Sequence, residues 1–82
     1  MFRHIMLENF LKLFKETLDI EDREINLSDD FRSYDEWDSI GNLSIIAMID
    51  EEYGIVIEGP HFKNLKTLQD LWDEIEKRKN NG

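Results

Sequence analysis

The chain begins with a helical repeat of apolar residues. Residues 3–18 place apolar side chains three and four positions apart, while Lys12, Lys15 and Glu16 fall on the opposite side. This pattern predicts an amphipathic helix with one face against a core. The periodicity stops over residues 19–38, which we expect to form a long first loop. The apolar residues that should hold this loop to the core are Ile20, Ile25, Leu27, Phe31 and Tyr34.

A second helix is predicted to begin at Ser39 and to run to about Tyr53. It should end at Gly54, because a residue without a Cβ tolerates the left-handed conformation that follows many helices. Its apolar residues are too numerous to lie on a single face of the helix. This indicates that the helix is buried on more than one side or that it presents an apolar surface to a partner. Ile40 and Ala47 share one face, and Ile40 is expected to be exposed. The residues of this helix expected in the core are Leu43, Ile46 and Tyr53.

The last third of the chain predicts a short helix followed by a longer one. Ile55-Val56-Ile57 has no second strand to pair with, so we interpret it as an extended linker. Pro60 fits the first position of a short helix over about residues 60–64, where its missing N–H has no cost. Thr67 and Asp70 resemble a capping box, which predicts the start of the final helix.

Together these elements predict an all-α fold, a small four-helix bundle of three longer helices and one short helix with a long first loop. The final helix should run to about Lys79, so we expect a single domain over residues 1–79 and a polar tail over residues 80–82. A chain of 82 residues is too short for two independent cores, which excludes a multi-domain enzyme. The expected protein is a monomer.

Composition and charge narrow the classes of partner. The net charge is −9, and residues 35–58 contain seven acidic residues and no Lys or Arg. Such a field repels phosphate backbones and anionic lipids, so neither nucleic acid nor a membrane is an expected partner. The sequence shows no secretory leader and no apolar run of membrane-spanning length, which favours the cytoplasm.

Several kinds of chemistry find no support in the sequence. The chain has no Cys, which removes disulfides, thiolate metal ligands and thiol nucleophiles. His4 and His61 are far apart and lack flanking ligands, so they are interpreted as surface residues and not as zinc ligands. Residues 19–24 resemble the start of a calcium loop, but Arg23 and Glu24 occupy the positions where an oxygen ligand and Gly are required. No metal site is expected, and Ser39 lacks the glycines of a nucleophile elbow.

Two features of the second helix depart from a sequence optimised for stability alone. Asp50, Glu51 and Glu52 occupy its last turn, where the helix dipole disfavours negative charge. Ser39 stands at the opposite, positive end, directly after Asp38. The ordinary interpretation of Ser39 is an N-cap whose hydroxyl accepts a backbone hydrogen bond. The other is an attachment point, because a phosphate there would be stabilised by the helix N-terminus.

The order of these residues resembles the acyl carrier protein family. The matching features are Asp38-Ser39-Ile40, an apolar helix, the acidic cluster, an aromatic residue and Gly54-Ile55-Val56-Ile57, and the order of helices over the whole chain also agrees. Gly41, Asn42 and Ser44 depart from the residues common in fatty-acid carriers, as does Trp37, which favours a specialised pathway over bulk fatty acid synthesis.

The resemblance implies a carrier and not an enzyme. Ser39 would bear 4′-phosphopantetheine donated by coenzyme A, with acyl or related carboxylate cargo held as a thioester on its terminal thiol. A phosphopantetheinyl transferase that binds Mg²⁺ would recognise Asp38 and Ile40. Acyl-transferring or acyl-activating enzymes with basic patches would dock on Ala47, Asp50, Glu51 and Glu52. The alternative is an acidic helical interaction module with the same fold that is never modified.

Overall fold

The computed structural model describes residues 2–81, with the side chains of residues 6–79. Four helices follow one another along this part of the chain, and it contains no β-strand. They are α1 (Phe2–Leu18), α2 (Ser39–Tyr53), α3 (Gly59–Phe62) and α4 (Leu68–Asn81), with a short 3-10 helix, η1 (Phe31–Ser33), inside the first loop. The predicted all-α bundle of three longer helices and one short helix is confirmed, whereas η1 was not predicted.

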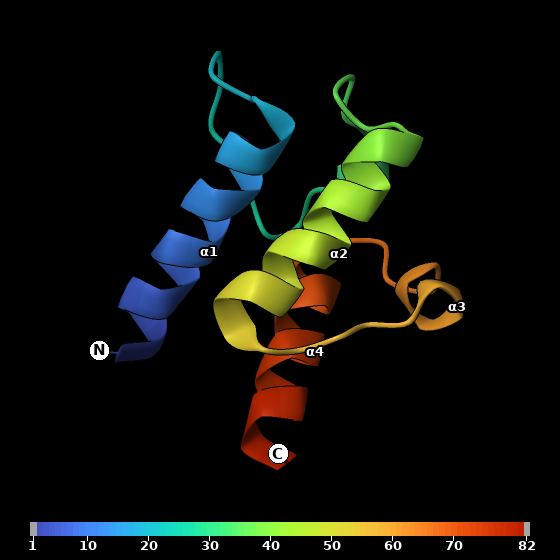
Figure 1. Cartoon of the computed structure of the whole chain (residues 1–82). Helices are drawn as coiled ribbons and strands as arrows, with labels where there is room; N and C mark the ends of the chain where they lie inside the picture. Colours follow the sequence, from blue (N-terminus) through green and yellow to red (C-terminus); the bar gives the residue numbers. More distant parts are fainter. Residues whose placement is uncertain (1, 82) are drawn as a thin grey trace.

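The helices pack so that α1 and α2 run antiparallel and side by side (Figure 1). Helix α4 crosses behind the C-terminal half of α2, and α3 lies to one side of the bundle in this view (Figure 1). No helix within residues 2–81 has the combination of length and apolar character that a membrane crossing requires. The N-terminus of α2 projects at one end of the bundle, beside the turn that follows α1 (Figure 1).

The helix boundaries agree with the predictions to within about two residues. Helix α2 begins and ends at the predicted residues, and Gly54 adopts the left-handed conformation with φ 67°. Helix α3 begins one residue earlier than expected and ends two residues earlier, so Pro60 occupies the second helical position and not the first. Helix α4 continues to Asn81, two residues beyond the predicted end and into the segment expected to be a polar tail.

The core consists of apolar side chains from every helix and from the first loop. Ile20, Ile25 and Phe31 of the loop are buried, and Leu27 and Tyr34 pack against the core, as predicted. The linker residues Ile55 and Ile57 are also buried, while Val56 between them is exposed. The other buried side chains are Phe10, Phe14, Leu18, Ile45, Met48, Ile49, Phe62, Leu65, Leu68, Leu71, Trp72 and Ile75.

The first loop supplies hydrogen-bond acceptors to the start of α4. The backbone N–H of Leu68 donates to the carbonyl of Asp29 at 3.1 Å, and that of Gln69 donates to Leu27 at 2.9 Å. These are N–H groups of the first helical turn, which have no partner inside their own helix. The predicted capping box completes the turn, because Asp70 accepts from the N–H of Thr67 at 3.2 Å and donates its own N–H to the Thr67 hydroxyl at 3.1 Å.

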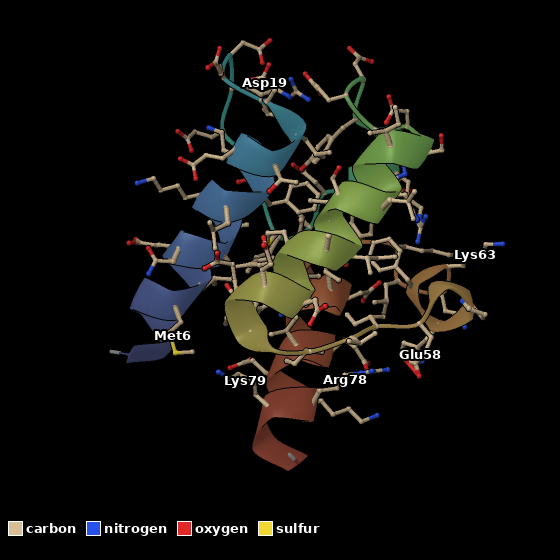
Figure 2. All side chains as sticks on the ribbon, viewed as in Figure 1. Met6, Asp19, Glu58, Lys63, Arg78 and Lys79 are labelled. Carbon is tan, nitrogen blue, oxygen red and sulfur yellow. The ribbon has the colours of Figure 1, made fainter. Side chains whose placement is uncertain are left out.

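An ion-pair network holds the short helix against α4. Glu74 accepts a hydrogen bond from Arg78 Nε at 2.6 Å and lies 3.1 Å from His61 Nε2. The same Arg78 guanidinium donates to the carbonyl of Val56 at 2.7 Å and to Glu58 at 3.2 Å (Figure 2). His61 is therefore a half-exposed residue paired with a carboxylate. His4, which was also predicted to lie at the surface, is outside the range of described side chains.

Candidate functional site

The N-terminus of α2 is capped by Asp38. The Asp38 backbone is extended, and its Oδ1 accepts a hydrogen bond from the backbone N–H of Gly41 at 2.7 Å. Ser39 is the first helical residue, and its side chain is exposed. The interpretation of Ser39 as the N-cap was therefore wrong, because the preceding carboxylate performs the capping. The Ser39 hydroxyl stands at the positive end of the helix and takes no part in the cap.

An apolar stripe runs along α2 from its N-terminus. Ile40 is 72% exposed, as predicted, and Leu43 is 67% exposed. Ala47 is also exposed and continues the same face by helical spacing. The expectation that Leu43 lies in the core was wrong, because the core side of α2 is formed by Ile45, Met48 and Ile49. The predicted packing of Ile46 and Tyr53 against the core is confirmed, although both are only partly buried.

The acidic end of α2 lies at the other end of this stripe. Asp50, Glu51 and Glu52 are all exposed, and the last turn of the helix contains no basic residue. No ion pair engages these three carboxylates within residues 6–79. Their charge is therefore available to a cation outside the chain.

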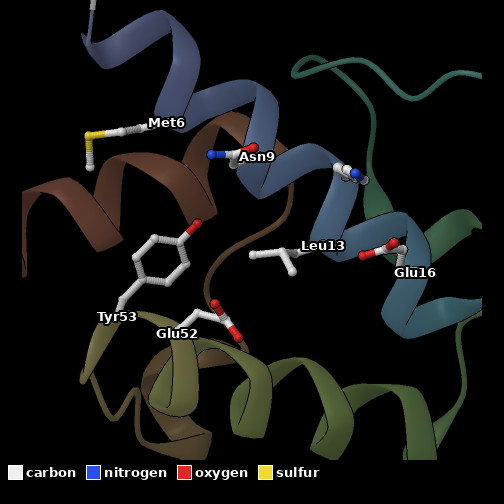
Figure 3. Close-up of a pocket in the computed structure, with 7 residues that line it drawn as sticks. Met6, Asn9, Leu13, Glu16, Glu52 and Tyr53 are labelled. Carbon is white, nitrogen blue, oxygen red and sulfur yellow. The ribbon is translucent and has the colours of Figure 1, made fainter.

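A groove between α1 and the end of α2 borders this acidic turn. It has a volume of about 340 Å³, and Met6 and Leu13 of α1 face it from one side while Glu52 and Tyr53 of α2 face it from the other (Figure 3). Burial raises the pKa of the Tyr53 phenol, and the neighbouring Glu52 carboxylate raises it further.

Two arginines of the first loop organise the segment before Ser39, and sequence reasoning missed both. Arg32 donates to the carbonyls of Leu65 and Phe62, at 3.1 and 2.5 Å, which ties η1 to the end of α3. Arg23 forms a two-pronged ion pair with Glu36, with Nη2 to Oε1 at 2.7 Å and Nη1 to Oε2 at 3.2 Å. Their position in the sequence among aromatic and acidic residues could have pointed to them, because Arg commonly stacks on aromatic rings and pairs with carboxylates.

The Arg23 ion pair lies in the segment that leads to the N-terminus of α2. Its hydrogen bonds lower the pKa of the Glu36 carboxyl, and the guanidinium lies 5.3 Å from the ring centroid of Tyr34. Burial raises the pKa of the Tyr34 phenol, whose hydroxyl donates to Asp29 at 2.7 Å. The pKa of Asp29 is lowered by a hydrogen bond from the Asn26 backbone and by this one from Tyr34.

The geometry agrees with a family of known proteins. A family model described as the phosphopantetheine attachment site matches residues 8–75. The chain belongs to this family. Its prosthetic group is 4′-phosphopantetheine, and its function is to carry that group, as the resemblance implied. No match was found among curated proteins.

A solved structure supports the fold of this phosphopantetheine carrier. The chain is similar to the solution structure of a holo acyl carrier protein from Geobacter metallireducens, with a TM-score of 0.75 and 22% identity. The match covers 87% of this chain and 82% of the other. The acyl-carrier-protein-like fold predicted from the sequence is thereby confirmed.

The described residues 6–79 contain no group of three or more His, Asp or Glu side chains arranged to hold a metal ion. The structure brings three of the predicted residues together at one end of α2, where Asp38 caps the helix and Ser39 and Ile40 are exposed. Asp50, Glu51 and Glu52 are grouped at the opposite end.

Proposed function

We propose that Ser39 is the residue to which 4′-phosphopantetheine is attached, and that the protein carries acyl cargo between enzymes without catalysing a reaction itself. The observation that carries this proposal is the exposed Ser39 hydroxyl at the first position of α2, free of any capping duty because Asp38 performs it. When bound, the prosthetic group supplies a thiol that can hold a carboxylate as a thioester.

The residues at this end of α2 fit a phosphodiester. The backbone N–H groups of Ser39 and Ile40 begin the helix and have no carbonyl partner one turn earlier. They and the helix dipole favour an anion at the Ser39 oxygen. In the modification, the Ser39 oxygen forms a new bond to the phosphorus that bears the pantetheine arm of coenzyme A. The pyrophosphate bond breaks, adenosine 3′,5′-bisphosphate leaves, and the hydroxyl proton passes to a base of the transferase.

The exposed face of α2 is the proposed docking surface. Its apolar stripe of Ile40, Leu43 and Ala47 leads from Ser39 toward Asp50 and Glu51, with Glu52 beside them. A partner with an apolar contact flanked by Lys or Arg matches this surface in both character and charge. The phosphopantetheinyl transferase would recognise Asp38 and Ile40 and bind the part of this surface nearest Ser39. Acyl-transferring or acyl-activating enzymes would reach the acidic end of α2. Charge attraction favours fast encounter, while a small surface keeps the complex short-lived.

The acyl character of the cargo is also part of the proposal. The Geobacter relative is a holo acyl carrier protein by its title. The match to the phosphopantetheine attachment family disfavours the alternative of an interaction module that is never modified.

Replacement of Ser39 tests the attachment. The purified protein is incubated with coenzyme A, Mg²⁺ and a promiscuous phosphopantetheinyl transferase, and its intact mass is measured. The wild type should gain one phosphopantetheine, and Ser39→Ala should gain nothing. Because Ser39 does not cap the helix, Ser39→Ala should also melt close to the wild type.

The matched control is Ser44→Ala, which removes the other hydroxyl of α2 and should leave modification intact. Wild-type protein that stays unmodified with several transferases, or Ser39→Ala protein that is still modified, would contradict the assignment. In the first case the unmodified interaction module becomes the better interpretation.

A further inference from the structure

A carboxylate of α4 joins the short helix α3 to the bundle. The Glu74 side chain is 11% exposed, and each of its two oxygens contacts a different side chain. Oε2 accepts a hydrogen bond from Arg78 Nε at 2.6 Å, and Oε1 lies 3.1 Å from Nε2 of His61 in α3. A movement of α3 away from α4 would therefore take the imidazole from a largely buried oxygen, which costs free energy.

The same end of α4 holds the linker that leads into α3. Arg78 Nη1 donates to the carbonyl of Val56 at 2.7 Å and to the Glu58 carboxylate at 3.2 Å. Because Arg78 is also bound to Glu74, the linker, α3 and α4 share one connected set of contacts. Arg stays protonated at every pH of interest, so the hold of Arg78 on the linker does not change near neutrality.

The opposite end of α3 is attached in a different way. Arg32 of η1 donates hydrogen bonds to the carbonyls of Phe62 and Leu65. The Phe62 side chain is also fully buried in the core. Neither a guanidinium nor a carbonyl changes its charge between pH 5 and 8. A pH change near neutrality therefore acts on α3 at its His61 end and not at its Arg32 end.

Four charged groups face His61 from the two segments packed against it. Glu74, Lys77 and Arg78 of α4 line one groove together with His61, and Glu58 of the linker interacts with it electrostatically. Glu74 is the group in contact, and it is also less exposed than Arg78 at 28% or Glu58 at 68%. A charge that is close and shielded from water acts more strongly than one that is distant and exposed. The Glu74 carboxylate therefore favours the protonated imidazole.

From these contacts we propose that His61 is a pH-sensitive latch that fastens α3 to α4. Histidine changes its charge between pH 5 and 8, whereas Glu and Arg side chains keep theirs over this range. His61 Nε2 can donate to Glu74 in both states, but protonation makes the contact a charge-assisted hydrogen bond, which is the stronger kind. The latch is tight on the acidic side of neutrality and loosens as the pH rises, while the far end of α3 stays bound to Arg32. This device does not depend on the proposed attachment at Ser39.

Amide hydrogen exchange of the full chain, followed residue by residue by NMR, tests the latch. The N–H groups of Phe62 and Lys63 donate to the carbonyls of Glu58 and Gly59 at 2.8 and 3.0 Å, so their exchange reports the opening of α3. Each rate is divided by the intrinsic rate at the same pH. Protection of both groups should rise roughly two- to fivefold from pH 8 to pH 6, which corresponds to a partly exposed ion pair. Protection of the Asn42 N–H, which is bonded at the start of α2, should not change.

The matched variant is His61→Asn, which keeps an N–H donor for Glu74 but cannot gain a proton. Protection of its α3 should be the same at pH 8 and pH 6. Lys77→Gln is the control, because it removes a charge from the same groove and leaves the imidazole in place. This control should retain the rise in protection at pH 6.

Four results would overturn the proposal. The first is a wild-type protein whose α3 protection is equal at both pH values. The second is a rise that persists in His61→Asn, because another group would then be responsible. The third is a rise shared equally by Asn42, which would indicate a change in the stability of the whole domain. The fourth is a rise lost in Lys77→Gln, which would assign the effect to the charge of the groove and not to the contact with Glu74.

Discussion

Asp38 Oδ1 lies 2.7 Å from the backbone nitrogen of Gly41 and accepts its hydrogen bond, so the residue before Ser39 closes the first turn of α2. The carbonyl of Asp38 also accepts the N–H of Asn42 at 2.9 Å. Asp38 therefore caps the helix, and the adjacent Ser39 is left for the proposed attachment. Asp38 can be altered to separate its structural contribution from its proposed recognition by the transferase.

Substitutions of Asp38 should have divergent effects on stability. Asp38→Ala removes the cap and should lower the free energy of unfolding by about 1 kcal/mol, whereas Asp38→Asn preserves an acceptor and should be nearly neutral. Urea unfolding measures the free energy of unfolding of both variants. If Asp38 also contributes to the transferase complex through its charge, Asp38→Asn should be modified more slowly than the wild type despite equal stability. Equal rates for Asp38→Asn and wild type would limit Asp38 to capping.

Gly41 should resist substitution although it lies in a helix. An Ala in an exposed helix interior is favoured over Gly by up to about 1 kcal/mol. At Gly41, however, a Cβ would come within 2.9 Å of Leu18 Cδ2 and 3.3 Å of Asp38 Oδ1. Overpacking of this kind costs about 1–3 kcal/mol, so Gly41→Ala should lower the melting temperature. Gly59→Ala is the control, because a Cβ there meets nothing within 4 Å. A more stable Gly41→Ala protein would contradict the close packing of α1 and α2.

Glu74 should stabilise the protein only above acidic pH. Its side chain is 11% exposed, and hydrogen bonds from Arg78 and then His61 hold its pKa below the ordinary value of 4.5. A carboxyl whose pKa is lowered by folding contributes stability above its unfolded pKa, and this contribution is lost as the pH falls through the folded pKa. Glu74→Gln should therefore lose about 1 kcal/mol at neutral pH.

The difference between wild type and Glu74→Gln should shrink below pH 4.5 and disappear in stronger acid. Urea unfolding across this pH range measures it. Asp73→Asn, on the exposed side of α4, serves as the matched control and should show a smaller difference at every pH. A Glu74→Gln deficit that persists unchanged in acid would mean that packing, and not charge, accounts for the effect.

Charge reversal at the end of α2 should weaken docking without harming the helix. Glu51→Lys with Glu52→Lys should reduce kcat/KM of the transferase and of pathway enzymes by roughly tenfold or more at low salt, because attraction to a basic patch is lost. The same change should stabilise α2 slightly, since Lys suits the negative end of the helix dipole. Steady-state kinetics and melting curves measure the two effects.

A control with the same net charge separates docking from overall charge. Glu21→Lys with Asp73→Lys places the reversals on the first loop and α4, away from the α2 surface, and should retain most of the activity. Equal losses in both double variants would show that total charge, and not the location of Glu51 and Glu52, determines the encounter.

Local signals in the sequence predicted most of the fold. Gly54 ends α2, and Thr67 with Asp70 starts α4, because each depends on backbone groups only a few residues away. The apolar residues of the first loop were also predicted correctly, since their hydrophobicity alone favours burial. The exposure of Leu43 was not predicted, because α2 is apolar on several faces and periodicity could not select the one against the core.

The contacts of the two arginines in the first loop could not be predicted from the sequence. Arg32 pairs with carbonyls about thirty residues further along the chain, and its choice of Phe62 and Leu65 depends on how α3 packs. The same holds for Arg23, which could have paired with any of several acids in the loop. Identity of the cap at α2 was ambiguous because Asp38 and Ser39 are both good N-cap residues, and only the backbone conformation distinguishes them.

The backbone bonds between the first loop and α4 limit how this carrier can be recombined with others. The carbonyls of Leu27 and Asp29 accept hydrogen bonds from the N–H groups of Gln69 and Leu68, which lie about forty residues further along the chain. A chimera that takes its first loop from one carrier and its last helix from another would have to re-create these bonds in register, or leave a helix end without acceptors. The first loop and α4 should therefore be transferred together in such a chimera, whereas the exposed face of α2 takes no part in these bonds.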